Sequence, residues 1–338
     1  MRLDVILPTY NRHQLLKLAL DSLLAAEVPA DLSVFVTVVD NNSSDATRET
    51  VETYRPKFCG RLYYVFEKKQ GRSHALNTGI SATNGDLVGM IDDDEQVDRS
   101  WFRRIYQMFS SGDVDFIGGP YVPHWGGAPR PWLPRNHAGV LGIVDAGSLH
   151  AYGTSHAELM GGNAVVSRKV LQKVGLYSID LGRKGKRPLA DEDTDMYRRL
   201  LAAGAKGMYV PDLIIHHYIH PERLSKRYFR AWHFWRGVSS GALDRRQPRE
   251  ATYLLGIPRY LFGRAIRALW RILKGIVSFK SKPAENFTDE LQMWDLVGFF
   301  YGKHLYGATY SWSDRYWDRG CRFSPKNSRH RLPEKPTK

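Results

Sequence analysis

The sequence contains little cysteine and no long apolar run. Its 338 residues include only two cysteines, Cys59 and Cys321, and a pair so far apart provides neither a disulfide framework nor the spacing of a metal site. No segment stays apolar and uncharged over the roughly 20 residues that a bilayer-spanning helix needs. The first residues, MRLDVILPTY, are typical of a strand that enters a turn and not of a signal peptide. These absences predict a cytoplasmic protein.

Negative charge is scarce in only one part of the chain. The formal net charge is +14, yet residues 1–220 carry 25 Lys and Arg against 25 Asp and Glu, whereas residues 221–338 carry 24 against 10. A basic region of this kind suggests an anionic partner, either a nucleic acid or an acidic membrane surface. No nucleic-acid-binding motif accompanies it, so we expect no nucleic-acid partner. Peripheral attachment to the inner face of the plasma membrane stays a candidate.

Hydrophobic patterning predicts an α/β fold for the first two thirds of the chain. Up to about residue 120, β-branched runs alternate with helical patterns, which indicates βαβ units and a mostly parallel, Rossmann-like sheet flanked by helices. The region 120–160 has no sustained period and predicts a long ordered loop or lid. The expected strands are residues 3–8, 33–40, 61–67, 86–92 and 114–119, and the expected helices are residues 11–27, 44–54, 71–82 and 98–109.

The last third has a different pattern. From residue 221 onward, aromatic and basic helical segments replace the α/β alternation. We therefore expect a domain at 1–220 and a helical, basic region at 221–338. The tail after residue 323 is polar, which predicts flexibility.

Four consecutive acids end the apolar run 87–91: Asp92, Asp93, Asp94 and Glu95. Like charges in contact raise one another's pKa, so a bound cation is one explanation, and a solvated acidic turn is the other. Asp92 and Asp94 stand two apart, so in an extended segment their side chains point the same way. They can share Mg²⁺ or Mn²⁺ while substrate phosphates complete its shell. In an open α/β sheet, such strand ends are where ligands bind.

A second acidic motif, DEDTDMYRRLL, occupies residues 191–201. With Asp191 as the helix N-cap, Asp193 falls on the same face as the apolar residues of this helix. An inward carboxylate near a ligand site is a candidate general base. For Glu192 and Asp195, the favourable interaction of acids with the first helical turn is an equal alternative.

Histidines and arginines follow in the segment 210–230. Either His216 or His217 could bind a metal or a phosphate, and their adjacent positions in a strand do not distinguish them; a packed histidine is the alternative. Arg223 and Arg227 are four apart, which suits one helical face that grips a diphosphate, although a solvated surface is equally compatible.

One helical segment of the basic region, residues 259–275, has an amphipathic pattern. Arg264, Arg267, Arg271 and Lys274 recur opposite Leu261, Phe262, Ile266, Leu269 and Leu273. Such a helix can lie in a membrane interface, or it can pack on the α/β domain with a solvated basic face.

Six motifs occur in a fixed order along the chain. They are PTYNR (8–12), VVDNNSSDAT (38–47), GRSHALNTGI (71–80), IDDDE (91–95), GGN (161–163) and EDTD (192–195). In this order, and over residues 3–240, they resemble the family 2 glycosyltransferases of the GT-A fold. The overall pattern is similar to bacterial exopolysaccharide glycosyltransferases of the succinoglycan type.

The resemblance implies roles for the matching residues. It implies that Asp94, together with Asp92, binds the metal and that Asp193, with Glu192 beside it, supplies the catalytic base. It also implies a further metal or diphosphate contact from His216 or His217. The residues that match the nucleotide-sugar site are Pro8, Thr9, Asn11, Asp40, Asn41, Arg72, Asn77, Asp92 and Asp93.

The implied activity is inverting, metal-dependent transfer of a sugar from a nucleotide sugar, with a UDP-sugar as the expected donor. A glycan or a polyprenyl-linked molecule is the expected acceptor, in surface polysaccharide synthesis. The alternative is a catalytically silent GT-A domain that binds nucleotide sugars or glycans. The presence of both the D-x-D acids and Asp193 argues against that alternative.

Overall fold

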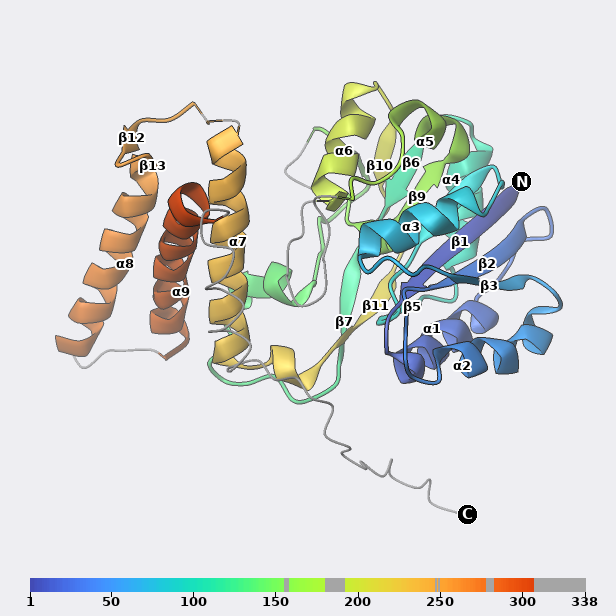
Figure 1. Ribbon diagram of the computed structural model, residues 1–338, viewed down its shortest axis with the longest axis horizontal. Helices are drawn as coiled ribbons and strands as arrows, with labels where there is room; N and C mark the ends of the chain where they lie inside the picture. Colours follow the sequence, from blue (N-terminus) through green and yellow to red (C-terminus); the bar gives the residue numbers. More distant parts are fainter. Residues whose placement is uncertain (155–157, 180–191, 247, 249, 278–282, 307–338) are drawn as a thin grey trace, which may run out of the picture.

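The computed structural model describes residues 1–154, 158–179, 192–246, 248, 250–277 and 283–306. Figure 1 shows an α/β part, which contains the N-terminus, beside a layer of three long helices. The predicted N-cap Asp191 and the predicted flexible tail after residue 323 lie outside the described residues. Among the described helices, none has the length and apolar character that crossing a membrane requires.

An eight-stranded sheet forms the centre of the α/β part. Its strands are β1 (Arg2–Thr9), β2 (Ser33–Asp40), β3 (Leu62–Phe66), β4 (Leu87–Met90), β6 (Phe116–Gly118), β8 (His150–Ala151), β9 (Ala164–Ser167) and β10 (Gly207–Tyr209). They lie in the order β3-β2-β1-β4-β9-β6-β10-β8. Neighbours from β3 to β4 are parallel, as are β6 and β10, whereas β9 runs antiparallel between β4 and β6. The predicted mostly parallel α/β fold is confirmed.

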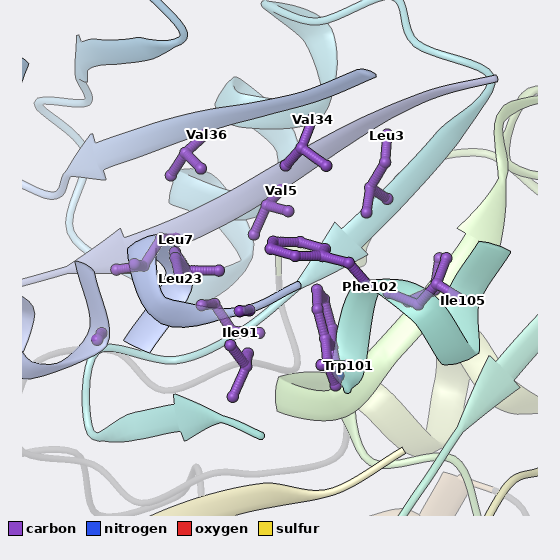
Figure 2. Packing of buried hydrophobic residues seen from close by; sticks show 14 of the residues in the cluster. Leu3, Val5, Leu7, Leu23, Val34, Val36, Ile91, Trp101, Phe102 and Ile105 are labelled. Carbon is purple, nitrogen blue, oxygen red and sulfur yellow. The ribbon is translucent and has the colours of Figure 1, made fainter. Parts of the chain in front are cut away.

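Helices cover both faces of this sheet. One face carries α1 (His13–Ala25), α2 (Thr47–Tyr54) and α4 (Trp101–Ser110), and the other carries α3 (Arg72–Ser81), α5 (Arg168–Val174) and α6 (Glu192–Ala202). Successive side chains of a strand point to opposite faces. In β1, Leu3, Val5 and Leu7 therefore belong to the first core and Ile6 to the second. Figure 2 shows Phe102 of α4 pointing toward the side chains of β1.

A three-stranded sheet connects the first acidic motif to a later segment. Its strands are β5 (Glu95–Val97), β7 (Tyr121–Trp125) and β11 (Ile215–Ile219). β11 pairs antiparallel with β5 and parallel with β7. Because β5 begins at the last of the four acids, this pairing brings the histidine-containing strand to the end of β4.

The prediction of a long ordered loop or lid at 120–160 is wrong in part. This region contains β7, the short strand β8 and a 3₁₀ helix at Arg135–Leu141. β7 and β8 pair with β11 and β10, whose residues follow much later in the chain. A local hydrophobic period does not reveal such short, distantly paired strands.

The helical layer contains α7 (Lys226–Arg246), α8 (Arg259–Val277) and α9 (Pro283–Phe300), with α9 between the other two (Figure 1). Gly237 and Gly241 of α7 approach Gly298 of α9 and Gly302 just beyond it. A β-carbon at any of these four positions would overlap the backbone of the opposite segment. Glycine therefore permits this close helix contact. A hairpin of β12 (Tyr253–Leu254) and β13 (Ile257–Pro258) leads into α8.

Aromatic side chains attach this layer to the α/β part. The ring of Trp132 lies 5.6 Å from that of Phe229 in α7 and 5.2 Å from that of Phe287 in α9, both edge to face. Such aromatic pairs add to the stabilisation from buried area. Ile219 and Leu224 belong to the same buried cluster, so the segment after β11 is packed where the two parts meet.

Candidate active site

The four consecutive acids form the turn that joins β4 to β5. Carboxylate oxygens of Asp92, Asp94 and Glu95 all lie within 4.8 Å of one another. Glu95 also accepts a 2.7 Å hydrogen bond from the backbone N–H of Asp92. Oxygen ligands at this spacing suit Mg²⁺ or Mn²⁺. The structure thus brings the two predicted metal ligands together and adds Glu95 to them.

Two arginines from distant segments contact these acids. Arg12, just before α1, donates to Asp93 at 2.8 Å and to Asp94 at 3.1 Å. Arg223, which follows β11, donates to Asp94 at 3.2 Å. A guanidinium also binds phosphate oxygens well. The two arginines therefore place positive charge beside the acidic turn.

Burial and neighbouring charges give the acids different pKa values. Burial raises the pKa of Asp93 to about 6, against the opposing charge of Arg12. Burial would also raise the pKa of Asp94, but the nearby His217 side chain and the charges of two arginines hold that pKa well below its ordinary value. Burial and the charges of the neighbouring acids raise the pKa of Glu95. A divalent cation would favour the ionised form of all three carboxylates.

Strand β11 separates the two adjacent histidines. His217 is buried, and its Nε2 lies 3.8 Å from Oδ2 of Asp94. His216 faces the other way, with its Nε2 3.9 Å from Oδ2 of Asp98 and with 42% of its side chain exposed. His220, just after β11, places its Nε2 3.8 Å from Asp94. The structure therefore brings His217 and His220 to the acids and leaves His216 outside.

Arg72, at the start of α3, links the acidic turn to the second predicted motif. Its guanidinium donates to Asp92 at 2.9 Å and to Asp193 at 3.0 Å, with Glu192 at 3.4 Å. Glu192 is buried, whereas 25% of the Asp193 side chain is exposed. Of the two, Asp193 is the carboxylate that a second substrate can approach.

The GGN motif leaves space for two of these carboxylates. A β-carbon at Gly161 would overlap the carboxylate of Asp193, and one at Gly162 would overlap that of Glu95. Asn163 is buried. Its amide oxygen accepts a hydrogen bond from the indole N–H of Trp101 in α4, and its amide N–H donates to the backbone carbonyl of Leu213, before β11. The motif is thus anchored in the core while its two glycines lie against the acids.

The loop after β1 contacts two other parts of the site. Pro8 is buried near the end of β1. Thr9 donates a 2.9 Å hydrogen bond to Asp93. Asn11, in the left-handed region at φ 52°, accepts a 2.7 Å hydrogen bond from the backbone N–H of Ser44. This loop therefore connects the acids to the loop that follows β2.

The other residues predicted near the nucleotide have partners within the fold. Asp40 is buried at the end of β2 and accepts a 2.7 Å hydrogen bond from a tyrosine hydroxyl of β3. Asn41 accepts a 2.8 Å hydrogen bond from the backbone N–H of Gly71 and so holds the loop before α3. Asn77 uses both ends of its amide to bind the backbone of Tyr177, at 2.8 Å each. Asn77 is therefore engaged with the segment after α5.

Sequence reasoning gave no individual role to two charged residues of the site. Arg12 lies inside PTYNR and Glu95 inside IDDDE, and the signal was present in both motifs as an unassigned charge next to an assigned residue. Arg223 reaches the acids, but it lies in a 3₁₀ turn before α7, so the expected single helical face with Arg227 is wrong.

The chain is similar in sequence to two named proteins. The succinoglycan biosynthesis protein ExoM of Rhizobium meliloti is 26% identical over 245 residues, which cover 72% of this chain and 75% of that protein. The glucosyl-dolichyl phosphate glucuronosyltransferase of Haloferax volcanii is 24% identical, over 74% of this chain and 80% of that protein.

The fold is similar to that of a solved enzyme, the mannosyltransferase PcManGT from Pyrobaculum calidifontis in complex with GDP-Man and Mn²⁺. The TM-score is 0.59 at 20% identity, covering 89% of this chain and 86% of that chain. The model of the family described as "Glycosyl transferase family 2" matches residues 4–175. The chain therefore belongs to glycosyl transferase family 2 and is a glycosyltransferase that takes its sugar from a nucleotide-sugar donor.

Proposed function

We propose that this enzyme transfers a sugar, with inversion and with a divalent metal, to a glycan or a lipid-linked acceptor in surface polysaccharide synthesis. One observation carries the proposal: Arg72 bonds both to Asp92 in the acidic turn and to Asp193 in α6. A donor-side carboxylate and a candidate base, which are far apart in sequence, are thus held within one side chain's reach. The relatives named for polysaccharide and dolichyl phosphate chemistry support the choice of acceptor class.

The donor end of the site is built from the acidic turn. Asp92, Asp94 and Glu95 would hold the ion, which offsets the negative charge of the departing nucleoside diphosphate. Arg12 and Arg223 would donate to its phosphate oxygens. We propose a UDP-sugar as donor, on the resemblance of the motifs; the solved mannosyltransferase was bound to GDP-Man, so GDP-sugars are the direct competitors in the test.

The acceptor end is built from α6. Asp193 would take the proton of an acceptor hydroxyl while that oxygen forms a bond to the anomeric carbon and the bond from that carbon to the diphosphate oxygen breaks. Attack from the side opposite the leaving group inverts the carbon, and no covalent sugar intermediate forms. Arg72 and Gly161 keep the Asp193 carboxylate in place for this step.

The proposal is tested by a melting series with UDP, GDP and dTDP, each with and without Mn²⁺. Because the acids repel one another until a cation compensates them, one nucleotide together with Mn²⁺ should raise the Tm by more than the sum of the separate shifts. The preferred nucleotide then selects the sugar nucleotides for a turnover assay that follows diphosphate release. Equal shifts with and without metal would contradict metal dependence. Tight binding without turnover over the whole panel would favour the alternative, a silent nucleotide-sugar-binding domain.

A further inference from the structure

Helix α8 is the outermost helix of the helical layer, and α9 separates it from α7 (Figure 1). The buried face of α8 combines two small residues with the half-buried Leu261 and Ile272, all at helical spacing. Ala265 and Ala268 are buried there, and Arg271 pairs with Asp289 of α9 at the rim. This buried face does not include all the large apolar residues of α8, so a second apolar face remains.

That second face is exposed along the length of α8. Its members recur at a spacing of three or four residues and so form one stripe. Ile266 is 66% exposed, Trp270 60% and Val277 79%, and Leu269 and Leu273 are exposed between them. A soluble protein rarely leaves a continuous row of large apolar side chains in water without a binding role. Of the two alternatives for this helix, packing of its apolar side on the α/β part therefore does not hold for this stripe.

A row of basic side chains runs beside the stripe. Arg264, Arg267 and Lys274 are exposed at helical spacing, and Lys274 lies 4.9 Å from the ring centroid of Trp270. The hairpin just before α8 adds an exposed apolar tip. Leu255 there is 75% exposed and has φ 51°, a conformation that Asn or Gly usually adopts in hairpin turns. Apolar and basic side chains are therefore presented together at this end of the molecule.

We propose that α8 docks flat on an anionic bilayer, with its apolar stripe in the headgroup–acyl boundary and its basic row on lipid phosphates. This occupant matches both rows. A second copy of the chain would bring a like row of arginines, and a nucleic acid would leave the apolar stripe in water. A bilayer provides apolar depth beside negative charge, and tryptophan is favoured at that boundary. This inference rests on the proposed function in one respect only: docking would bring the enzyme to lipid-linked acceptors.

The test is flotation of the full chain with phosphatidylcholine vesicles that contain or lack phosphatidylglycerol. We expect binding to the anionic vesicles, weakened by salt. Ile266→Asn with Leu273→Asn should reduce binding at least about tenfold, because two apolar side chains lose their burial. Arg264→Glu with Arg267→Glu should remove the preference for anionic lipid. The matched control is Leu149→Asn with Leu176→Asn, two similarly exposed leucines of the α/β part, which should bind as the unmodified protein does.

Two results would overturn the proposal. The first is an unmodified protein that fails to float, or an Ile266→Asn/Leu273→Asn variant that floats like its control. The second is a lipid-free dimer in light scattering that this variant abolishes, which would assign the stripe to a second copy. Metal-dependent hydrolysis of a sugar nucleotide in lipid-free buffer tests the proposed function separately. That activity should be equal in all these variants, whatever their flotation.

Discussion

Arg72, the first residue of α3, donates a 3.0 Å hydrogen bond to the carboxylate of Asp193 in the first turn of α6. The same guanidinium bonds to Asp92 in the acidic turn. Because the positive guanidinium of Arg72 reaches both carboxylates, it compensates two negative charges that would otherwise repel each other. The relation ties the donor end of the site to the candidate base, and it explains why residues so distant in sequence must be placed together.

Gly161→Ala should lower turnover by a factor of about 10 to 100, because a β-carbon at this position overlaps the Asp193 carboxylate and misplaces the candidate base. The nucleotide-dependent Tm shift should be kept, since the acidic turn is untouched. Gly162→Ala should do the reverse and weaken the metal response, because its β-carbon overlaps Glu95. Gly139→Ala is the control, with nothing within 4 Å of its added carbon. Equal losses in all three variants would argue against specific displacement of carboxylates.

Asp94→Asn should abolish the extra Tm shift that Mn²⁺ gives in the presence of nucleotide, because the amide is a poor ligand for a divalent cation. Its basal stability should also fall, on the order of 2 kcal/mol, since the cations of Arg12 and Arg223 lose a buried partner charge. Asp98→Asn is the control, because that carboxylate lies beside the outward-facing His216. A normal metal response in Asp94→Asn would remove this residue from the metal site.

Protonation linked to His220 should destabilise the fold as the pH falls from about 6.5 toward 4. Burial, aided by the positive charges of Arg12 and Arg223 and opposed by Asp94 and Glu222, lowers the pKa of His220 to about 4. The unfolded chain binds a proton near pH 6.5 that the folded chain binds only near pH 4, so the free energy of unfolding falls between these values. His220→Gln should reduce the loss between pH 7 and 5 by on the order of 1 kcal/mol, allowing for solvent screening.

Urea unfolding at a series of pH values measures this difference. The raised pKa of Asp93, about 6, acts with the opposite sign, because its folded form binds a proton more readily than the unfolded chain. The comparison of His220→Gln with the unmodified protein cancels that contribution. Parallel stability curves for the two proteins would show that His220 does not titrate differently on folding.

Local patterns were sufficient to predict the strands whose carboxyl ends form the ligand-binding edge of the central sheet. The segments 3–8 and 33–40 are continuous apolar runs bounded by polar turns, and they form β1 and β2 with small changes at the ends. The acids at 92–94 were placed correctly at a strand end for the same reason. Each of these features depends on residues that are neighbours in the chain.

The pairing of strands that are distant in the chain could not be predicted from local patterns. Nothing in AVVS, the sequence of β9, indicates that it runs antiparallel between β4 and β6. The choice between His216 and His217 depended on how β11 pairs with β5, about 120 residues earlier in the chain. The position of Arg223 follows from the same pairing. Register is set by which face becomes buried, and this is known only when the whole sheet is assembled.

The most direct measurement of the central claim compares Asp193→Asn with Asp195→Asn. Both changes lie in the first turn of α6, but the Asp195 carboxylate pairs with Arg199 at 2.8 Å, away from the contact that Arg72 makes with Asp193. The melting series first identifies the nucleoside diphosphate that gives the largest Tm shift with Mn²⁺. The assay then measures release of that nucleoside diphosphate from the corresponding sugar nucleotide. Asp193→Asn should lower that rate by a factor on the order of 100 to 10,000, because the amide cannot accept a proton, while Asp195→Asn stays near the unmodified rate and both keep the Tm shift. Near-normal release by Asp193→Asn would contradict the assignment of this carboxylate as the base.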